Sequence, residues 1–358
     1  MNKLTKTALI LILVGIILIV SGLFAGAKLR YDLPGKGAFG INRLDDNISD
    51  DYYSEDWEFD EDDYYEDIED IDDIDDIKLQ TLDIEMDKRH WISEETRMVQ
   101  SNKVKTEKME FDKIEDVVLE IPLYSVEIVG ISGNKPILVY ETIISGENQK
   151  NPIIIEQTDE TSIHITGSSN LEEVIRKLKY SPKLVLFVPN GELKTLETSL
   201  DLGKQYIKNI VVEKGDINSD LGKIKIKNSK LSSFQINNDL GKVEIDNSEI
   251  IDTSINNEMG DISCERSSLE DVQFSSSVGK IDLENITIIN KVSVQAEIGA
   301  VEIDNVKNSN DDKLSMKLNT ELGRVKVFGE NHNTGITIKG LGSDFLEVKT
   351  ELGSITVE

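Results

Sequence analysis

The phrase Asp239-Leu240-Gly241-Lys242-Val243-Glu244-Ile245-Asp246-Asn247 decides the fold, because close copies of it recur through the second half of the chain. The glycine of the phrase belongs to a series whose step is 19 residues four times and then 20, 24 and 30 residues. A nearly fixed period of this size is typical of a solenoid. The predicted structural corners are Gly203, Gly222, Gly241, Gly260, Gly279, Gly299, Gly323 and Gly353.

Within each repeat, apolar and polar residues alternate. The positions one before, two after and four after the glycine are apolar, as in Leu240, Val243 and Ile245. A second alternating pair lies five and seven residues before the glycine, as in Ile236 and Phe234. Because alternation with period two is typical of half-buried strands, each repeat is predicted to hold two short strands. They would join at the glycine corner and close at an Asn or Ser turn.

One repeat has too little apolar surface to fold alone, but repeats stacked in parallel bury a continuous ladder of Leu, Ile and Val. We therefore predict an all-β, single-domain parallel β-solenoid with 19-residue coils. The alternative, a sandwich of antiparallel hairpins, would not need a constant step. Corner glycines suit positive φ or a close backbone approach, and asparagines six residues later suit the left-handed region and could stack as an amide ladder. These asparagines are Asn228, Asn247, Asn285 and Asn305.

The chain is predicted to consist of four segments. Residues 1–7 form a short N-terminal tail, residues 8–27 a transmembrane helix, residues 28–110 an acidic disordered linker and residues 111–358 the β-solenoid. Within the solenoid, residues 111–198 form an irregular opening section, residues 199–306 regular coils and residues 307–358 degenerate coils. A short capped helix after Asn170 is expected inside the opening section, because Glu173 follows this asparagine at the spacing of a capping box.

Residues 8–27 contain no charge and are long enough to cross a bilayer once, so the lipid bilayer is the first predicted partner. A cleaved signal peptide is the alternative, because Lys3 and Lys6 precede the apolar run and Ala25-Gly26-Ala27 is similar to a cleavage site. A basic segment ahead of a first apolar run favours a single-pass protein of the cell membrane with an extracytoplasmic solenoid. Nearly balanced charges on the two sides of the run leave the opposite topology as an alternative.

Acidity is concentrated in residues 45–76, which hold 19 acidic and no basic residues of a chain whose net charge is −29. Such a segment repels itself and stays disordered. It is either a solvated stalk or a docking segment for a basic partner, with its aromatic residues as anchors. Residues 77–358 carry a further net charge of −15. This charge excludes nucleic acid as a partner and favours cations, including cationic peptides.

No motif for catalysis, cofactor binding or metal binding is present. His90, His164 and His332 are far apart and lack the spacing of metal ligands or of a nucleophile and its base. Cys264 occupies the buried fourth position after Gly260, so it is predicted to be a small core residue, and a lone thiol excludes an internal disulfide.

Carboxylates stand two residues before seven of the eight glycines. Coils about 4.8 Å apart would place them in a row of like charges. The repulsion could be relieved by the basic residues three positions on, by corner backbone amides or by bound Ca²⁺. The basic residues and the lack of a calcium-binding motif favour no metal. The candidates for a cation column are Asp220, Asp239, Glu258, Glu297 and Glu321.

Residues 111–129, the strand 184–189 followed by residues 193–198, and the repeated Leu-Gly-Lys-Ile phrase resemble a bacterial family of β-strand-repeat domains of unknown function called "putative adhesins". The resemblance covers residues 111–358. It implies a single-domain β-solenoid, often tethered to the membrane of Gram-positive bacteria and in some members associated with envelope stress. It supplies no catalytic residues, and the acidic linker is not part of the family pattern.

We therefore expect a non-enzymatic, membrane-anchored β-solenoid of the cell envelope that acts as an interaction, adhesin-like or envelope-stress module. Its expected partners are an envelope protein, a glycan or a cationic peptide. One alternative is a polysaccharide-cleaving β-helix enzyme, which would need an exposed acidic pair. Another is a membrane signalling accessory protein that works through a partner. The oligomeric state is unknown from the sequence.

Overall fold

The computed structural model describes residues 96–99, 102–144, 153–167, 182–310, 314–340 and 342–358. The chain divides into two units, residues 1–72 and residues 73–358, and every described residue belongs to the second. The predicted tail, the transmembrane helix, the linker up to residue 95 and the short helix after Asn170 lie outside the described residues. Within the described residues, no helix is long and apolar enough to span a bilayer.

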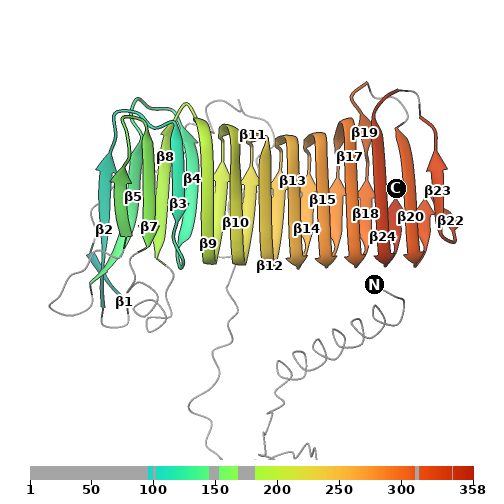
Figure 1. Cartoon of the computed structure of the whole chain (residues 1–358), viewed down its shortest axis with the longest axis horizontal. Helices are drawn as coiled ribbons and strands as arrows, with labels where there is room; N and C mark the ends of the chain where they lie inside the picture. Colours follow the sequence, from blue (N-terminus) through green and yellow to red (C-terminus); the bar gives the residue numbers. More distant parts are fainter. Residues whose placement is uncertain (1–95, 100–101, 145–152, 168–181, 311–313, 341) are drawn as a thin grey trace, which may run out of the picture. The chain divides into compact units, whose positions relative to one another are not determined.

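Every regular element in the described residues is a β-strand (Figure 1), as the sequence predicted. The opening section contains β1 (Thr96–Val99), β2 (Asn102–Glu110), β3 (Asp116–Glu120), β4 (Ser125–Ile131), β5 (Ile137–Ile144), β6 (Ile153–Gln157), β7 (Ser162–Gly167) and β8 (Lys183–Pro189). The regular part contains β9 (Glu192–Lys208), β10 (Val211–Lys227), β11 (Lys230–Ser232), β12 (Phe234–Asp246), β13 (Glu249–Met259), β14 (Ile262–Glu265), β15 (Ser268–Val278), β16 (Ile281–Glu284), β17 (Thr287–Ile298), β18 (Val301–Asp304) and β19 (Lys307–Asn308). The closing part contains β20 (Ser315–Leu322), β21 (Val325–Val327), β22 (Glu330–His332), β23 (Gly335–Ile338), β24 (Phe345–Leu352) and β25 (Ile355–Val357).

The opening section differs from the coils because it mixes parallel and antiparallel pairs. β3 and β4 pair in parallel with β9, the first long strand of the regular part. β5 pairs antiparallel with both β2 and β8. Because β2 is hydrogen-bonded to β5 from Lys103 to Glu110, strand structure starts before residue 111, within the range that the sequence assigned to the linker.

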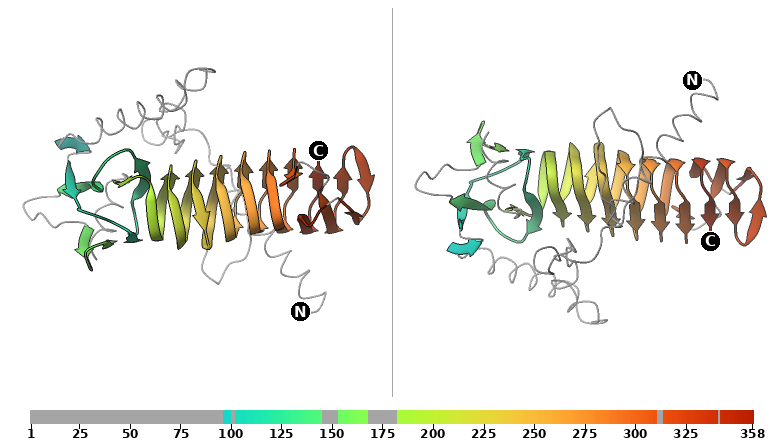
Figure 2. Two further views of the ribbon diagram at one scale, coloured as in Figure 1. Left: turned by 90° about the horizontal axis from the view of Figure 1, so that it is seen from above. Right: turned by 90° about the horizontal axis from the view of Figure 1, so that it is seen from below.

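Coils of the regular part contain three strands each, and not the two that the sequence predicted. In one coil these are β11, the start of β12 and the end of β12, and each pairs in parallel with its equivalent in the next coil. We call the three resulting ladders, in chain order, ladders 1, 2 and 3. Between ladders 1 and 2 the chain turns at a left-handed residue that the sequence did not reveal as a corner. These residues are Ser233, Asp252, Asp271 and Asn290. Figure 2 shows the coils side by side along the stack.

A continuous apolar core runs through the stack from Val104 to Val357. The opening section adds a second, small cluster of Ile131, Val139, Val185 and Phe187. Ladder 1 contributes residues such as Leu231, ladder 2 Ile236 and ladder 3 Ile245, all of which are buried. A stacked β-fold of this kind gains its stability because each coil covers the apolar edge of the next. The prediction of a parallel β-solenoid is therefore confirmed for the described residues.

Corner glycines are required because successive coils approach closely at the backbone. A Cβ atom on Gly241 would lie 1.7 Å from the carbonyl oxygen of Gly222, and the same clash repeats along the series. At the next corner, Asn228 and Asn247 adopt positive φ values of 50° and 46°. The Nδ2 group of Asn247 donates to Oδ1 of Asn228 at 2.8 Å. Both the left-handed asparagines and their amide ladder are thus as predicted.

The closing part does not follow the order of the sequence. β24 lies between β17 and β20 and pairs in parallel with both (Figure 1). β25 likewise lies between β18 and β21. The antiparallel strands β22 and β23 then pair with β21 and β20. The last residues of the chain therefore occupy an inner coil of the stack.

Candidate functional site

The residues immediately before the corner glycines form an exposed aliphatic row, which we call the corner row. They pair in register from coil to coil, as in Leu221 with Leu240 and Leu240 with Met259. Six of them leave 39–68% of their surface exposed. Large apolar side chains that are contiguous on a surface mark interaction sites. In stack order the corner row is Leu202, Leu221, Leu240, Met259, Val278, Ile298, Leu352 and Leu322.

On the ladder 2 side of the corner row stand the predicted carboxylates, which we call the carboxylate column. The candidates Asp220, Asp239, Glu258, Glu297 and Glu321 are all exposed. Their side chains make no hydrogen bond or ion pair with another residue of the described ranges. In that part of the chain, no three His, Cys, Asp or Glu residues gather so that they could hold a metal ion. The carboxylate column is completed by Asp201 and Glu351.

On the ladder 3 side stand the basic residues that follow the glycines, which we call the basic row: Lys204, Lys223, Lys242, Lys280 and Arg324. The ammonium groups of Lys223 and Lys242 lie 3.0 and 2.8 Å from the Glu244 carboxylate. Burial by itself would raise the pKa of Glu244, but hydrogen bonds from the two lysines outweigh it and hold the pKa below its ordinary value. Hydrogen bonds to Asp282 and Glu302 raise the pKa of Lys280.

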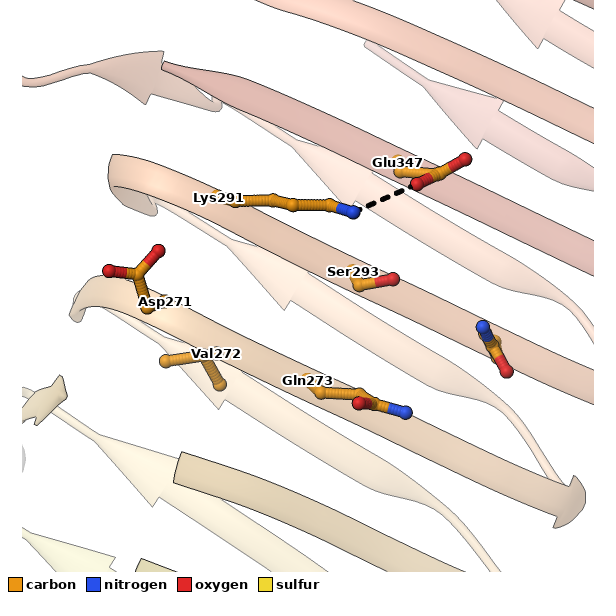
Figure 3. A pocket seen from close by; sticks show the side chains of 7 residues that line it. Asp271, Val272, Gln273, Lys291, Ser293 and Glu347 are labelled. Atoms are coloured by element: carbon orange, nitrogen blue, oxygen red, sulfur yellow. Dashed lines mark ion pairs between the residues drawn. The ribbon is translucent and has the colours of Figure 1, made fainter. Parts of the chain in front are cut away.

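A shallow polar groove with a volume of about 440 Å³ lies on the outer face of ladder 2 (Figure 3). Amide, hydroxyl, carboxylate and ammonium groups line it, and the Lys291 Nζ atom lies 3.1 Å from the Glu347 carboxylate. Hydrogen bonds from Lys317 and Lys291 lower the pKa of Glu347. The lining residues are Asp271, Val272, Gln273, Lys291, Ser293, Gln295 and Glu347.

The groove forms where one coil is a residue longer than the other regular coils. The pairing of β15 with β17 shifts by one residue between Glu270 and Val272, so that Asn290 and Lys291 together oppose Asp271. The sequence signal for this feature is the step of 20 residues from Gly279 to Gly299. A bulge of this kind changes the direction of nearby side chains.

Isolated histidine and cysteine side chains do not form a site with their neighbours in the described ranges. Nε2 of His164 lies 3.1 Å from the Glu120 carboxylate on the exposed face of β3 and β7. Cys264 is fully buried, and burial raises the pKa of its thiol to about 12. The thiol is therefore protonated and shielded, in agreement with a role in the core, and His90 lies outside the described residues.

Comparison with known proteins identifies a family and two solved structures. A family model described as Toastrack DUF4097 matches residues 139–358. No curated protein matches the chain. One similar crystal structure is of a "putative adhesin" from Bacteroides fragilis NCTC 9343, with 12% identity over 71% of this chain and 97% of that chain and a TM-score of 0.44. Another is of a "putative cell adhesion protein" from Clostridium sporogenes ATCC 15579, with 12% identity over 72% of this chain and 98% of that chain and a TM-score of 0.22.

Proposed function

Since this chain belongs to the Toastrack DUF4097 family, we propose that it is a non-enzymatic interaction module of the cell envelope. In this proposal residues 8–27 anchor the chain in the cell membrane and the β-solenoid lies outside the cytoplasm. Its ligand is an envelope glycan. The uncharged segment at residues 8–27 supports the anchor.

The observation that carries the proposal is the polar groove on ladder 2. Its volume is about 440 Å³, and it is open to solvent. The amides of Gln273 and Gln295 and the hydroxyl of Ser293 both donate and accept hydrogen bonds, as do the hydroxyls of a sugar. Because these groups stand on paired strands, their positions are held by the ladder. A polar, open and preformed surface of this kind suits a chain of sugar residues.

Binding of soluble envelope polysaccharide fragments to the full chain in membrane nanodiscs, measured by calorimetry, tests the proposal. We expect the double variant Gln273→Ala, Gln295→Ala to bind at least tenfold more weakly. Gln235→Ala is the matched control, because Gln235 is exposed at the equivalent position of ladder 2 two coils away, and we expect it to bind as the unmodified chain does. Equal binding by all three proteins would contradict the groove as the site. Cleavage of the polysaccharide would replace the proposal with the enzyme alternative.

Topology is tested separately with a tag placed after Glu358. We expect an external protease to remove the tag in intact cells, because the solenoid would lie outside the membrane. Protection of the tag until the cells are lysed would contradict an extracytoplasmic solenoid. A second tag ahead of residue 8 is the control, and we expect it to be protected in intact cells.

A further inference from the structure

We propose that the glycine corner is a homodimer interface, in which two copies pack corner row against corner row with their stacks parallel and in register. A two-fold axis would then run along the stacks between the two corners. The inference does not depend on the proposed function, because it rests on the corner row and the charges on its two sides.

The corner row supplies the apolar centre of such an interface. It crosses eight coils, which at about 4.8 Å per step gives a strip roughly 34 Å long. Its leucines stay exposed, at 44% for Leu240 and 68% for Leu322, while residues two positions after each glycine are buried. A partner that covers the strip must present apolar groups at the same step. A second copy does so without further adjustment, because a two-fold interface uses the same patch on both subunits.

Charges on the two sides of the corner row select the parallel orientation. The carboxylate column flanks the row on ladder 2 and the basic row flanks it on ladder 3. A two-fold axis along the stack places each carboxylate column against the basic row of the other copy. An axis across the stack would instead place carboxylates against carboxylates. Parallel packing in register brings Asp220 toward the partner's Lys223 and Asp239 toward the partner's Lys242, and complementary charges of this kind fix the register of an interface.

The carboxylate column gains most from this arrangement, because its side chains would acquire ionic partners in the other copy. Asp220 and Asp239 make no hydrogen bond or ion pair with other residues of the described ranges, although they stand in a row of like charges. Lys223 and Lys242 contact Glu244, but an ammonium group has three donors and can serve a second carboxylate. In one coil the charges disfavour this packing, because Asp261 stands where most other coils have a basic residue. Glu258 would therefore face the partner's Asp261. There the Asp261 carboxylate accepts a hydrogen bond from the backbone amide of Lys280 in the next coil.

Disulfide cross-linking of the full chain in membranes tests the orientation. In a parallel dimer Leu221 and Leu240 each face the same residue of the other copy, so Leu221→Cys and Leu240→Cys should each give a covalent dimer on oxidation. Val211→Cys is the matched control, because Val211 is an aliphatic residue of ladder 1 with 44% exposure, and we expect it to stay monomeric. The native thiol of Cys264 is fully buried and gives no background. Failure of both corner variants to cross-link would overturn the proposal. Cross-linking only between Leu221→Cys and Leu352→Cys, which would meet in an antiparallel dimer, would also overturn it.

Charge reversal tests the pairing independently of the cysteines. We expect Asp220→Lys with Asp239→Lys to weaken dimerisation of the detergent-solubilised full chain at least tenfold, measured by sedimentation. Adding Lys223→Glu and Lys242→Glu should restore it, because opposite charges would again face each other. The homodimer is overturned if the fourfold variant does not recover dimerisation although circular dichroism shows its fold intact. That result would favour a cationic peptide as the ligand, because such a peptide would need only the carboxylates.

Discussion

Individual glycines are required at the corners for two reasons. The first is conformational, because Gly241 and Gly260 have φ values of 140° and 131°, which residues with a side chain rarely adopt. The second is steric, because the Cβ that any other residue would add at Gly241 or Gly260 falls within 2 Å of a carbonyl oxygen in the neighbouring coil. The repeated phrase therefore keeps glycine both because the backbones touch there and because most of these corners have a positive φ.

Gly222→Ala should destabilise the solenoid by about 3 kcal/mol or more, because a Cβ there would lie 1.8 Å from the Gly203 carbonyl oxygen and the coils must separate locally to accept it. Gly342→Ala is the control, since a Cβ there would have only the Asn308 Nδ2 atom nearby, at 3.5 Å. The free energies of unfolding of the two variants in urea should differ by at least about 2 kcal/mol. Equal stabilities would contradict a steric role for the corner glycines.

The Glu244 carboxylate should make stability depend on pH. Its pKa is lowered in the folded chain, so its contribution is present at neutral pH and is lost as the pH falls below the ordinary value of 4.5. We expect Glu244→Gln to cost about 1 kcal/mol at pH 7 and progressively less in acid. Glu249→Gln removes an exposed pair with Lys230 and should change stability by less than about 0.5 kcal/mol at any pH. Urea unfolding at pH 7 and pH 3 measures both variants, and a constant cost of Glu244→Gln across this range would contradict the assignment.

At the scale of the strands, the sequence predicted the parallel stack and most of its core. Alternation placed Ile236, Val243 and Ile245 inside, where they lie. It failed for Leu240, because the chain bends at Gly241 and two consecutive residues then face outward. It also missed ladder 1, whose strand β11 spans only Lys230–Ser232 and is too short to show a period. The groove depends on one inserted residue, which a pattern averaged over repeats conceals.

The order of the last strands could not be predicted from the sequence, for a different reason. Corner phrases at Gly323 and Gly353 are alike, so either could stack on the coil of Gly299. In the structure Gly353 takes this place and Gly323 stacks on Gly353. β24 can therefore be regarded as a strand that holds the closing part onto the regular coils.

Removal of residues 343–358 should test this order. Without β24 and β25, β20 and β21 lose their parallel partners, and we expect their amide hydrogens to exchange at least 100-fold faster. Strands β9 to β13 lie several coils away and serve as the internal control, with protection unchanged. Retained protection of β20 would mean that β20 can pair directly with β17, and the strand order would then not be required for folding.

For the molecule as a whole, the shared geometry of the coils means that the stack can be shortened by a whole coil. Stability of a solenoid is roughly the sum of its repeats and the interfaces between neighbours, so a complete repeat can be removed without damage to the rest. Leu221, Leu240 and Met259 are equivalent in register, as are the core residues around them. Deletion of residues 239–257 joins Asn238 to Glu258 and removes one 19-residue coil with every later side chain still on its own face.

We expect this 19-residue deletion to fold cooperatively with a modest loss of stability and an unchanged circular dichroism spectrum per residue. Deletion of residues 239–258, one residue more, leaves a step of 18 residues between two corner glycines, which is shorter than any step in this chain. It should fail to restore the stack, because a slip of one position turns each strand's apolar set outward. Its apolar residues would then face solvent, and we expect aggregation or loss of cooperative unfolding. Thermal unfolding and light scattering distinguish the two proteins. Similar behaviour of both would show that the coils adjust their register locally, and the constant 19-residue step would need another cause.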